Sequence, residues 1–432
     1  MSVSQLVRGP LLVPRPGGHV DYYPDGVLAA DPVGTLLYAG SWSGLACQLG
    51  DDRPPVRRAA GVMLPPLLDV HTHVPQHPIR GRFVEGVPDD APGGKLLAGL
   101  QRNVFPAEAK CGDPAHAEAV ARAFAADTLG HGVVGGMAYM TVSAAATEAA
   151  LGVLPETWSV GMVLMDQNCP AYLRTDGPAV EADHDRLAGR FGRRVVVTDR
   201  FAVAVGTPLR HRAVAVAARL GLRTQTHLNE QVAEKAFVER ELYPQYDSYT
   251  DVYRRDGLLD HACVLAHCVH MRPDEWGIVR DSGSAIAHCP TSNLHLGSGV
   301  MDLDEVLARG ISYAVATDVG ASPTVSLLAE VGRFLQVHAG RSTRATLTEG
   351  LYRVTLGAAD LLGLDRTLGR LEAGRPMSFI EVATRAPDAR LADEAILGLI
   401  PENLDAPVPA VRRVTLGGTA AFVPSLGTPG EG

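Results

Sequence analysis

The sequence predicts an α/β protein: a (β/α)8 barrel accompanied by a small β-sandwich that the two ends of the chain form together. Three observations lead to this fold. Between residues 62 and 375, strand-like apolar runs alternate with helical patterns. Eight such runs can be counted there, and the flanking segments, residues 1–61 and 376–432, hold strand-like runs of their own. Eight βα units in succession are typical of a parallel barrel.

The two flanking segments have the composition of short strands separated by turns. Their strand candidates are residues 11–13, 26–28, 35–38, 378–382 and 411–416. Because one segment precedes the barrel and the other follows it, we expect them to pair in one small sandwich domain. The last stretch, residues 424–432, is expected to be disordered.

The central region, residues 62–375, is predicted to be the catalytic barrel. Its strand candidates are residues 67–70, 133–140, 159–165, 194–198, 222–227, 263–267, 284–288 and 311–317. Helical patterns such as residues 208–220 and 325–337 separate them, and a long loop through residues 105–108 is expected after the first strand. Catalytic groups of such a barrel lie at the C-terminal ends of the strands.

The composition limits the classes of function. The chain has 432 residues and a net charge of −9 at pH 7, without a run of like charges, so we expect no nucleic-acid partner. No apolar run reaches membrane-spanning length and no signal pattern opens the chain, so we expect no membrane partner. The six cysteines form no CxxC pair, which suits a reducing compartment. The default expectation is a cytoplasmic protein that acts on a small molecule.

A His-x-His pair follows the first barrel strand. Side chains alternate along a strand, so His71 and His73 point the same way. An isolated pair of this kind is more often structural than metal-binding. Here the ends of later predicted strands add three more ligand-type residues, His227, His267 and Asp318. Four imidazoles and one carboxylate at one rim suit a zinc-like ion.

The end of the fourth strand bears on the number of metal ions. A second, bridging metal on such a barrel usually needs a carboxylated lysine there. The strand ends in Thr198, Asp199 and Arg200, and the three lysines of the chain, Lys95, Lys110 and Lys235, lie elsewhere. We therefore expect a single metal, which would lower the pKa of a bound water.

Glu230 stands three residues after His227. At that spacing its carboxyl group can reach a water at the metal and shuttle protons between water and substrate. The alternative is a glutamate in the first turn of a helix, where the helix dipole favours it. The two interpretations are compatible.

With these residues in place, the chain resembles the guanine deaminases of the amidohydrolase superfamily. The likeness covers about residues 62–375. It rests on His71-Thr72-His73-Val74-Pro75-Gln76, Phe105-Pro106-Ala107-Glu108, Met165-Asp166-Gln167-Asn168, Asp199-Arg200-Phe201, Thr226-His227-Leu228-Asn229-Glu230, Leu242-Tyr243-Pro244-Gln245-Tyr246, Ala266-His267-Cys268, Ala287-His288-Cys289-Pro290-Thr291-Ser292-Asn293-Leu294 and Ala316-Thr317-Asp318-Val319.

The resemblance implies a role for each matching residue. One zinc ion per chain would be held by His71, His73, His227, His267 and Asp318. Glu230 and Asp318 would be catalytic. The substrate would be contacted by His73, Gln76, Arg200, Phe201, Glu230 and Asp318. An arginine fork can donate two N–H bonds to a carbonyl oxygen and a ring nitrogen. The alternative for Arg200 is a surface ion pair, for example with Asp199. The family also implies a homodimer and a place in purine catabolism.

The sequence departs from the family pattern at two positions near the expected pocket. Asp199 stands where the family usually has Pro, and Gly99 stands where it usually has Trp. A missing indole would open the pocket or let another ring fill the space.

The predicted reaction is hydrolytic deamination of guanine to xanthine and ammonia. A close alternative is the same chemistry on another aminated ring, such as an oxidised purine, a pterin or a triazine. A more distant alternative is a catalytically silent amidohydrolase-like scaffold, which would usually lack the metal ligands.

Overall fold

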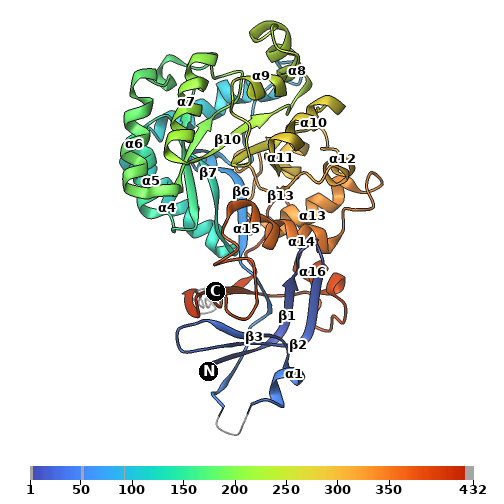
Figure 1. Cartoon of the computed structure of the whole chain (residues 1–432). Helices are drawn as coiled ribbons and strands as arrows, with labels where there is room; N and C mark the ends of the chain where they lie inside the picture. The colour runs from blue at the N-terminus through green and yellow to red at the C-terminus, as the bar shows by residue number, and fades with distance from the viewer. Residues whose placement is uncertain (1–2, 50–52, 92, 424–432) are drawn as a thin grey trace, which may run out of the picture.

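The computed structural model describes residues 3–49, 53–91 and 93–423 (Figure 1). It confirms the (β/α)8 barrel: eight strands follow one another in chain order around one sheet, and all adjacent pairs are parallel. The strands are β6 (Leu67–His73), β7 (Val133–Tyr139), β8 (Trp158–Leu164), β9 (Val195–Asp199), β10 (Arg223–Leu228), β11 (Cys263–His267), β12 (Ala285–His288) and β13 (Tyr313–Val315).

Hydrogen bonds from two backbone N–H groups close the barrel between its last and first strands. The backbone N–H of Asp318, just after β13, donates to the carbonyl oxygen of His71 on β6 at 2.9 Å. The N–H of Thr317 donates to the carboxylate of Asp69 at 3.2 Å. The seam therefore brings two predicted site residues, Asp318 and His71, together through the main chain.

Helices surround the barrel between successive strands. They are α4 (Pro114–Gly130), α5 (Ala144–Val153), α6 (Val180–Phe191), α7 (Thr207–Leu220), α8 (Val232–Phe237), α9 (Tyr249–Arg255), α10 (Pro273–Ser282), α11 (Pro290–His295), α12 (Leu303–Ala308), α13 (Leu327–His338), α14 (Leu347–Val354) and α15 (Leu356–Leu362). Side-chain caps start several of them: Asp113 accepts from the N–H of His116, and Ser326 from that of Ala329. Among the described residues, no helix combines the length and the apolar character needed to cross a membrane.

The segment after β6 is largely helical, where the sequence predicted a long loop. It contains the short helices η1 (Val74–Ile79) and α2 (Gly94–Gly99), the π-helical turn η2 (Leu100–Val104) and α3 (Phe105–Lys110). Leu96, Leu100 and Val104 are buried at a spacing of four residues, which is the spacing of a helix face. Pro106 lies in the first turn of α3, where it costs no hydrogen bond.

The ends of the chain pair in a separate sheet, as predicted. Its order is β16-β15-β14-β5-β1-β2-β3, with β4 beside β1. The strands are β1 (Gln5–Pro14), β2 (Val20–Ala30), β3 (Leu36–Ser41), β4 (Val56–Arg58), β5 (Val62–Leu64), β14 (Phe379–Val382), β15 (Val411–Leu416) and β16 (Thr419–Phe422). Two helices, α1 (Trp42–Ala46) and α16 (Ala392–Leu399), accompany them.

The terminal sheet has an apolar core of its own, which includes Val7, Leu11 and Phe379. Strand β5 joins the two ends, because Met63 pairs with Leu11 on one side and with Glu381 on the other. We propose residues 1–61 and 376–432 as one domain and residues 62–375 as the barrel. Strand β5, at the start of the barrel range, pairs in the terminal sheet and forms the connection between the two domains. The expectation for residues 424–432 lies outside the described residues.

Candidate metal centre and substrate pocket

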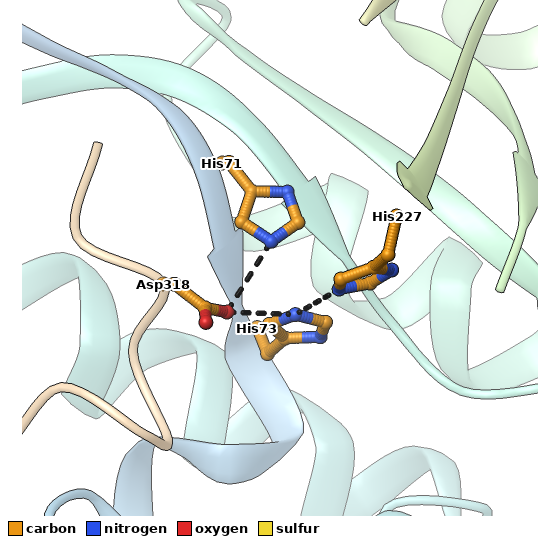
Figure 2. Close-up of side chains that lie close together, drawn as sticks. All are labelled: His71, His73, His227 and Asp318. Atoms are coloured by element: carbon orange, nitrogen blue, oxygen red, sulfur yellow. Dashed lines mark hydrogen bonds and ion pairs between the residues drawn. The ribbon is translucent and has the colours of Figure 1, made fainter. Parts of the chain in front are cut away.

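Four of the five predicted ligands form one compact group at the C-terminal rim of the barrel (Figure 2). One ligand atom from each of His71, His73, His227 and Asp318 lies within 4.8 Å of the others. Asp318 Oδ1 is 3.2 Å from His71 Nε2 and 3.1 Å from His73 Nε2. The Nε2 atoms of His73 and His227 are 3.3 Å apart. Both histidines of the His-x-His pair thus face the same point.

The chemistry of this group fits a divalent metal. Burial lowers the pKa of His71 to about 4 and the pKa of His227 well below its usual range, so both rings are neutral at pH 7. Neutral imidazole is the form that binds a metal. His71 Nε2 is completely buried without a hydrogen-bond partner among the described residues. A buried polar atom of this kind needs a partner, and a metal ion between the four donors would supply it.

Carbonyl groups fix the tautomers of two histidines. His227 Nδ1 lies 2.7 Å from the backbone oxygen of Arg200, and His267 Nδ1 lies 2.9 Å from Asn293 Oδ1. A carbonyl oxygen only accepts, so each Nδ1 carries a proton, and Nε2 is the nitrogen that offers a lone pair when the ring is neutral. Partners of this kind orient metal-binding histidines in proteins.

His267, the fifth predicted ligand, lies at the edge of the group. Its Nε2 is 3.9 Å from Asp318 Oδ2 and 3.6 Å from Glu230 Oε2. The atom is buried and has no hydrogen-bond partner among the described residues. Its place between two carboxylates puts it beside the proposed metal and water, and its assignment as a ligand stays a prediction.

Asp318 is held in an uncommon backbone conformation. Its φ is 52°, in the left-handed region that non-glycine residues rarely adopt. The hydrogen bond of its N–H to His71 fixes the backbone, and Ser292 Oγ donates to Oδ2 at 2.6 Å. Burial acts to raise the pKa of Asp318, but the neighbouring imidazoles of His71 and His73 outweigh it and hold that pKa well below its usual range. The side chain therefore enters the site as a carboxylate.

Glu230 lies beside this group with one oxygen fixed. Ser298 Oγ donates to Glu230 Oε1 at 3.0 Å, while Oε2 faces His267. The side chain is only 2% exposed, and burial raises its pKa to about 7. A carboxyl group with that pKa can give and take a proton near neutral pH. Because α8 begins at Val232, Glu230 precedes the helix instead of lying in its first turn.

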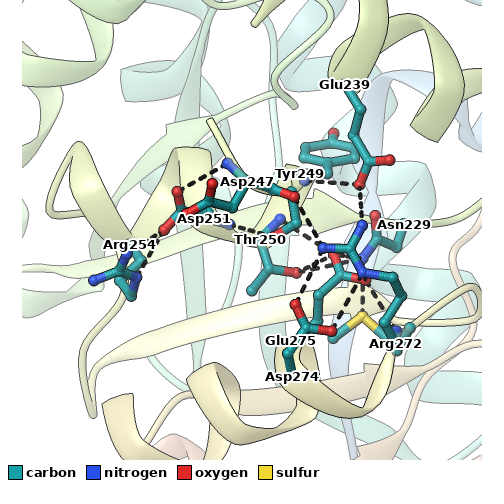
Figure 3. Close-up of polar contacts among 12 residues, drawn as sticks. Asn229, Glu239, Asp247, Tyr249, Thr250, Asp251, Arg254, Arg272, Asp274 and Glu275 are labelled. Carbon is teal, nitrogen blue, oxygen red and sulfur yellow. Dashed lines mark hydrogen bonds and ion pairs between the residues drawn. The ribbon is translucent and has the colours of Figure 1, made fainter. Parts of the chain in front are cut away.

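A polar network holds the turn that carries Glu230 (Figure 3). Asn229 has a φ of 51°, and its side-chain Nδ2 donates to Glu275 Oε1 at 2.9 Å. Its backbone oxygen accepts from the N–H groups of Val269 and His270 at 3.1 and 2.9 Å. The side chain and the main chain of Asn229 therefore both fix the turn between His227 and Glu230.

A cavity opens onto the same group. It is lined by His73, Gln76, Phe83, Leu96, Leu100, Arg200, Phe201, His227, Glu230, His267, Leu296 and Asp318. This set includes every residue that the sequence predicted to contact the substrate. A lining of apolar side chains with a few polar groups is typical of a site for a small ligand.

Phe83 takes the space next to Gly99, the position where the family usually has Trp. A Cβ atom on Gly99 would come within 2.7 Å of two ring atoms of Phe83. Phe83 is 6% exposed and lines the cavity. Of the two outcomes considered for the missing indole, the structure shows the second, in which another ring fills the space.

Arg200 is a buried pocket residue, so its interpretation as a surface residue paired with Asp199 is wrong. Its side chain is 3% exposed and its Nη1 lies 2.7 and 2.8 Å from the two carboxylate oxygens of Glu108. Asp199 pairs with Arg210 instead, at 2.8 Å. The two neighbours point to different partners because side chains alternate at the end of β9.

Sequence reasoning missed several residues that hold the site. Ser292 and Ser298 donate to the two carboxylates, and Asn293 and Glu108 hold His267 and Arg200. Ser292, Asn293 and Glu108 belong to segments on which the family resemblance rests, but only the fold brings them close to their partners. Ser298, four residues beyond its nearest such segment, gave no local signal.

A parallel barrel with three histidines and an aspartate at its C-terminal rim defines a hydrolase of the amidohydrolase type. Residues 62–408 match the amidohydrolase family. Guanine deaminase of Escherichia coli (strain K12) is 31% identical over 80% of this chain and 79% of that protein, and guanine deaminase of Rattus norvegicus is 30% identical over 76% and 73%. The solved structure of the E. coli guanine deaminase has a TM-score of 0.85 at 26% identity and covers 98% of this chain and 100% of that chain. The chain belongs to the amidohydrolase family and, within it, to the guanine deaminases.

Proposed function

We propose that this protein is a zinc-dependent enzyme that hydrolyses guanine to xanthine and ammonia. One observation carries the proposal: a single cavity is lined by three members of the metal-binding group, His73, His227 and Asp318, together with Glu230, Arg200 and Gln76. The metal-binding residues and Glu230 supply hydrolytic chemistry, and Arg200 and Gln76 supply hydrogen bonds for a purine. The guanine deaminases to which the chain is similar support this substrate.

The metal would be held by His71, His73, His227 and Asp318, with His267 beside them. A zinc ion bound there would lower the pKa of a water molecule and so supply a nucleophile near neutral pH. We propose one such ion per chain, because β9 ends in Asp199 instead of a lysine.

The protein residues would then move the protons. Asp318, a carboxylate in the site, accepts a proton from the attacking water. Glu230 protonates the ring nitrogen next to the carbon that carries the amino group. After the water oxygen has bonded to that carbon, Glu230 takes the proton of the new hydroxyl group and passes it to the amino group, and the carbon–nitrogen bond breaks. Asp318 then returns its proton to Glu230. Guanine and water give xanthine and ammonia, and both carboxyl groups return to their starting state.

The buried site favours this sequence of steps for a physical reason. Glu230 is fixed through Oε1 by Ser298, so only Oε2 is left to exchange protons with the substrate. Phe83, Leu96 and Leu296 contribute apolar lining to the cavity, which would exclude water around a bound ring. Exclusion of water strengthens the hydrogen bonds that hold the ring.

The experiment that tests the proposal is a balance of products. Purified, zinc-loaded protein is incubated with guanine, and ammonia and xanthine are measured together. The proposal predicts equal amounts of both, at a rate proportional to enzyme. Absence of both products, with zinc bound, would reject guanine as the substrate and leave another aminated ring, such as an oxidised purine, a pterin or a triazine, as the alternative.

A homodimer, a cytoplasmic location and a role in purine catabolism are further parts of this proposal. They rest on the family likeness. Sedimentation velocity on the purified chain tests the first of them.

A further inference from the structure

The buried carboxylate of Glu108 contacts both Arg200 and Gln76, the two cavity residues proposed to hydrogen-bond the substrate ring. It accepts from Arg200 Nη1 through both oxygens, and Gln76 Nε2 lies 3.2 Å from its Oε1. Glu108 lies on α3, Gln76 on η1, and Arg200 directly follows β9. Glu108 has no exposed surface. One side chain therefore ties together three segments that are distant in the sequence.

Glu108 fixes which way the amide of Gln76 faces. A carboxylate only accepts hydrogen bonds, so the atom of Gln76 that faces it must be the amide nitrogen. The amide oxygen is then turned away from Glu108. It lies against Gly320, where a Cβ atom would come within 2.0 Å of Oε1. Oε1 accepts no hydrogen bond from the part of the chain that the structure describes, and it is left as an acceptor for a ligand in the cavity.

Glu108 also fixes which donors of Arg200 remain free. Only Nη1 of the guanidinium contacts the carboxylate. Nε and Nη2 make no side-chain hydrogen bond to any described residue, and Arg200 lines the cavity. The guanidinium lies 5.3 Å from the centre of the Phe105 ring. The cavity thus offers N–H donors from Arg200 and an acceptor from Gln76.

The ion pair also sets the charge of this side of the cavity. A guanidinium is always protonated, and the carboxylate at 2.7 Å neutralises it. A neutral ring with a carbonyl acceptor next to an N–H donor matches these groups, whereas an anionic ring would meet no net positive charge. We propose that Glu108 is a positioning residue that makes the pocket select neutral lactam rings over anionic ones. This inference rests on the proposed function, because guanine is such a ring.

Replacing Glu108→Gln tests the proposal, since glutamine keeps the size and shape but removes the charge. We expect the KM for guanine to rise about tenfold, with kcat changed much less, because Arg200 and Gln76 lose their fixed orientations. We expect the inhibition constant of urate, an oxopurine that is a monoanion at neutral pH, to fall about tenfold, because Arg200 then carries an uncompensated charge in a buried site. Opposite shifts for the neutral and the anionic purine are the signature of this role. Equal losses for both, or no change in either, would overturn it.

Glu381→Gln is the matched control. Glu381 is also a buried glutamate that pairs with an arginine through both oxygens, at 2.6 and 3.1 Å from Arg57, but it lies in the terminal sheet. The Glu381→Gln substitution should lower the free energy of unfolding without changing the ratio of the KM for guanine to the inhibition constant of urate. A shift of that ratio in the control would overturn the assignment to Glu108.

A double-mutant cycle decides whether Glu108 acts through Arg200. In an Arg200→Ala background, Glu108→Gln should produce little of the change in urate inhibition that it produces in the wild type. A full-sized change in that background would contradict the proposal. Urate carries no amino group and can be titrated calorimetrically against the zinc-loaded protein without turnover, and guanine can be titrated against zinc-loaded variants in which Glu230→Gln blocks turnover. Failure of the wild type to release ammonia would therefore reject the proposed function and leave the test of Glu108 intact.

Discussion

Arg210 pairs with Asp199 in the protein interior, with 2.8 Å between Nε and Oδ2 and no exposed surface on either side chain. Arg210 also contacts Asp256 at 2.7 Å and donates to the backbone oxygen of Val205. Its guanidinium lies 5.1 Å from the ring of Tyr253. Asp199, one of the two departures from the family pattern, is thus part of an interior ion-pair network outside the set of residues that line the cavity.

This network predicts a stability defect without a specificity defect. Arg210→Met leaves Asp199 and Asp256 buried without their partner, so we expect the free energy of unfolding to fall by about 3–5 kcal/mol. Denaturant titration measures it. Arg212→Met is the control, because Arg212 pairs with Glu181 at the surface and should cost less than about 1 kcal/mol. If both variants lost the same small amount, the interior network would not be stabilising the fold.

The contact between Phe83 and Gly99 predicts a compensating pair of substitutions. Phe83→Ala should lower kcat/KM for guanine roughly tenfold, because an aromatic wall of the cavity is lost. Gly99→Trp alone should also reduce it, because the indole meets the Phe83 ring. The double variant should recover part of the loss, since the indole then has room. Additive losses in the double variant would show that the two positions do not share one space.

Arg200→Ala should reduce kcat/KM for guanine about ten- to a hundredfold and leave zinc content unchanged, because hydrogen bonds to a charged group are lost. Arg200→Lys should restore only part of the activity, since a point charge does not reproduce two parallel N–H bonds. Adenine should be rejected by about 10⁴ or more, because it lacks the carbonyl acceptor. Near-normal guanine turnover by the alanine variant would place Arg200 outside the recognition of the ring.

The donor group predicts one zinc per chain. Elemental analysis of the purified protein should find about one equivalent, and His227→Ala should lower it sharply, because four ligand-type groups converge on one point. Two equivalents, or an active preparation without metal, would contradict the single-metal site.

Glu230→Gln should keep metal and substrate binding but lose turnover. An amide can neither give nor take a proton at neutral pH, and general acid–base roles are typically worth about 10²–10⁴ in rate. The test compares kcat with zinc content and with guanine affinity measured calorimetrically. A variant that keeps more than about a tenth of the wild-type rate would assign the proton transfer to another group.

The barrel and the terminal sheet were predictable from the sequence because both follow from the order of strand-like runs. The rim residues were predictable for the same reason: His71, His73, His227 and Asp318 come at or just after strand ends, and parallel strands bring those ends together. The fold itself was needed to show that β13 closes on β6 through Asp318 and His71.

Contacts between distant segments were beyond the sequence. Nothing local indicates that Glu108 meets Arg200, that Ser298 meets Glu230, or that Phe83 fills the space at Gly99. The sequence predicts a loop after β6 because the helices there are short and are interrupted by glycine and proline. Their stability comes from packing over the barrel rim, which propensity does not report.

The central claim is that this site deaminates guanine in preference to other aminated rings. Its most direct test is kcat/KM from ammonia release by the zinc-loaded protein over a panel of guanine, 8-oxoguanine, pterin, an aminotriazine and adenine. The account predicts the highest kcat/KM for guanine and the lowest for adenine. The Glu230→Gln variant should release ammonia from each ring at no more than about a hundredth of the wild-type rate. A higher kcat/KM for another ring than for guanine would contradict it.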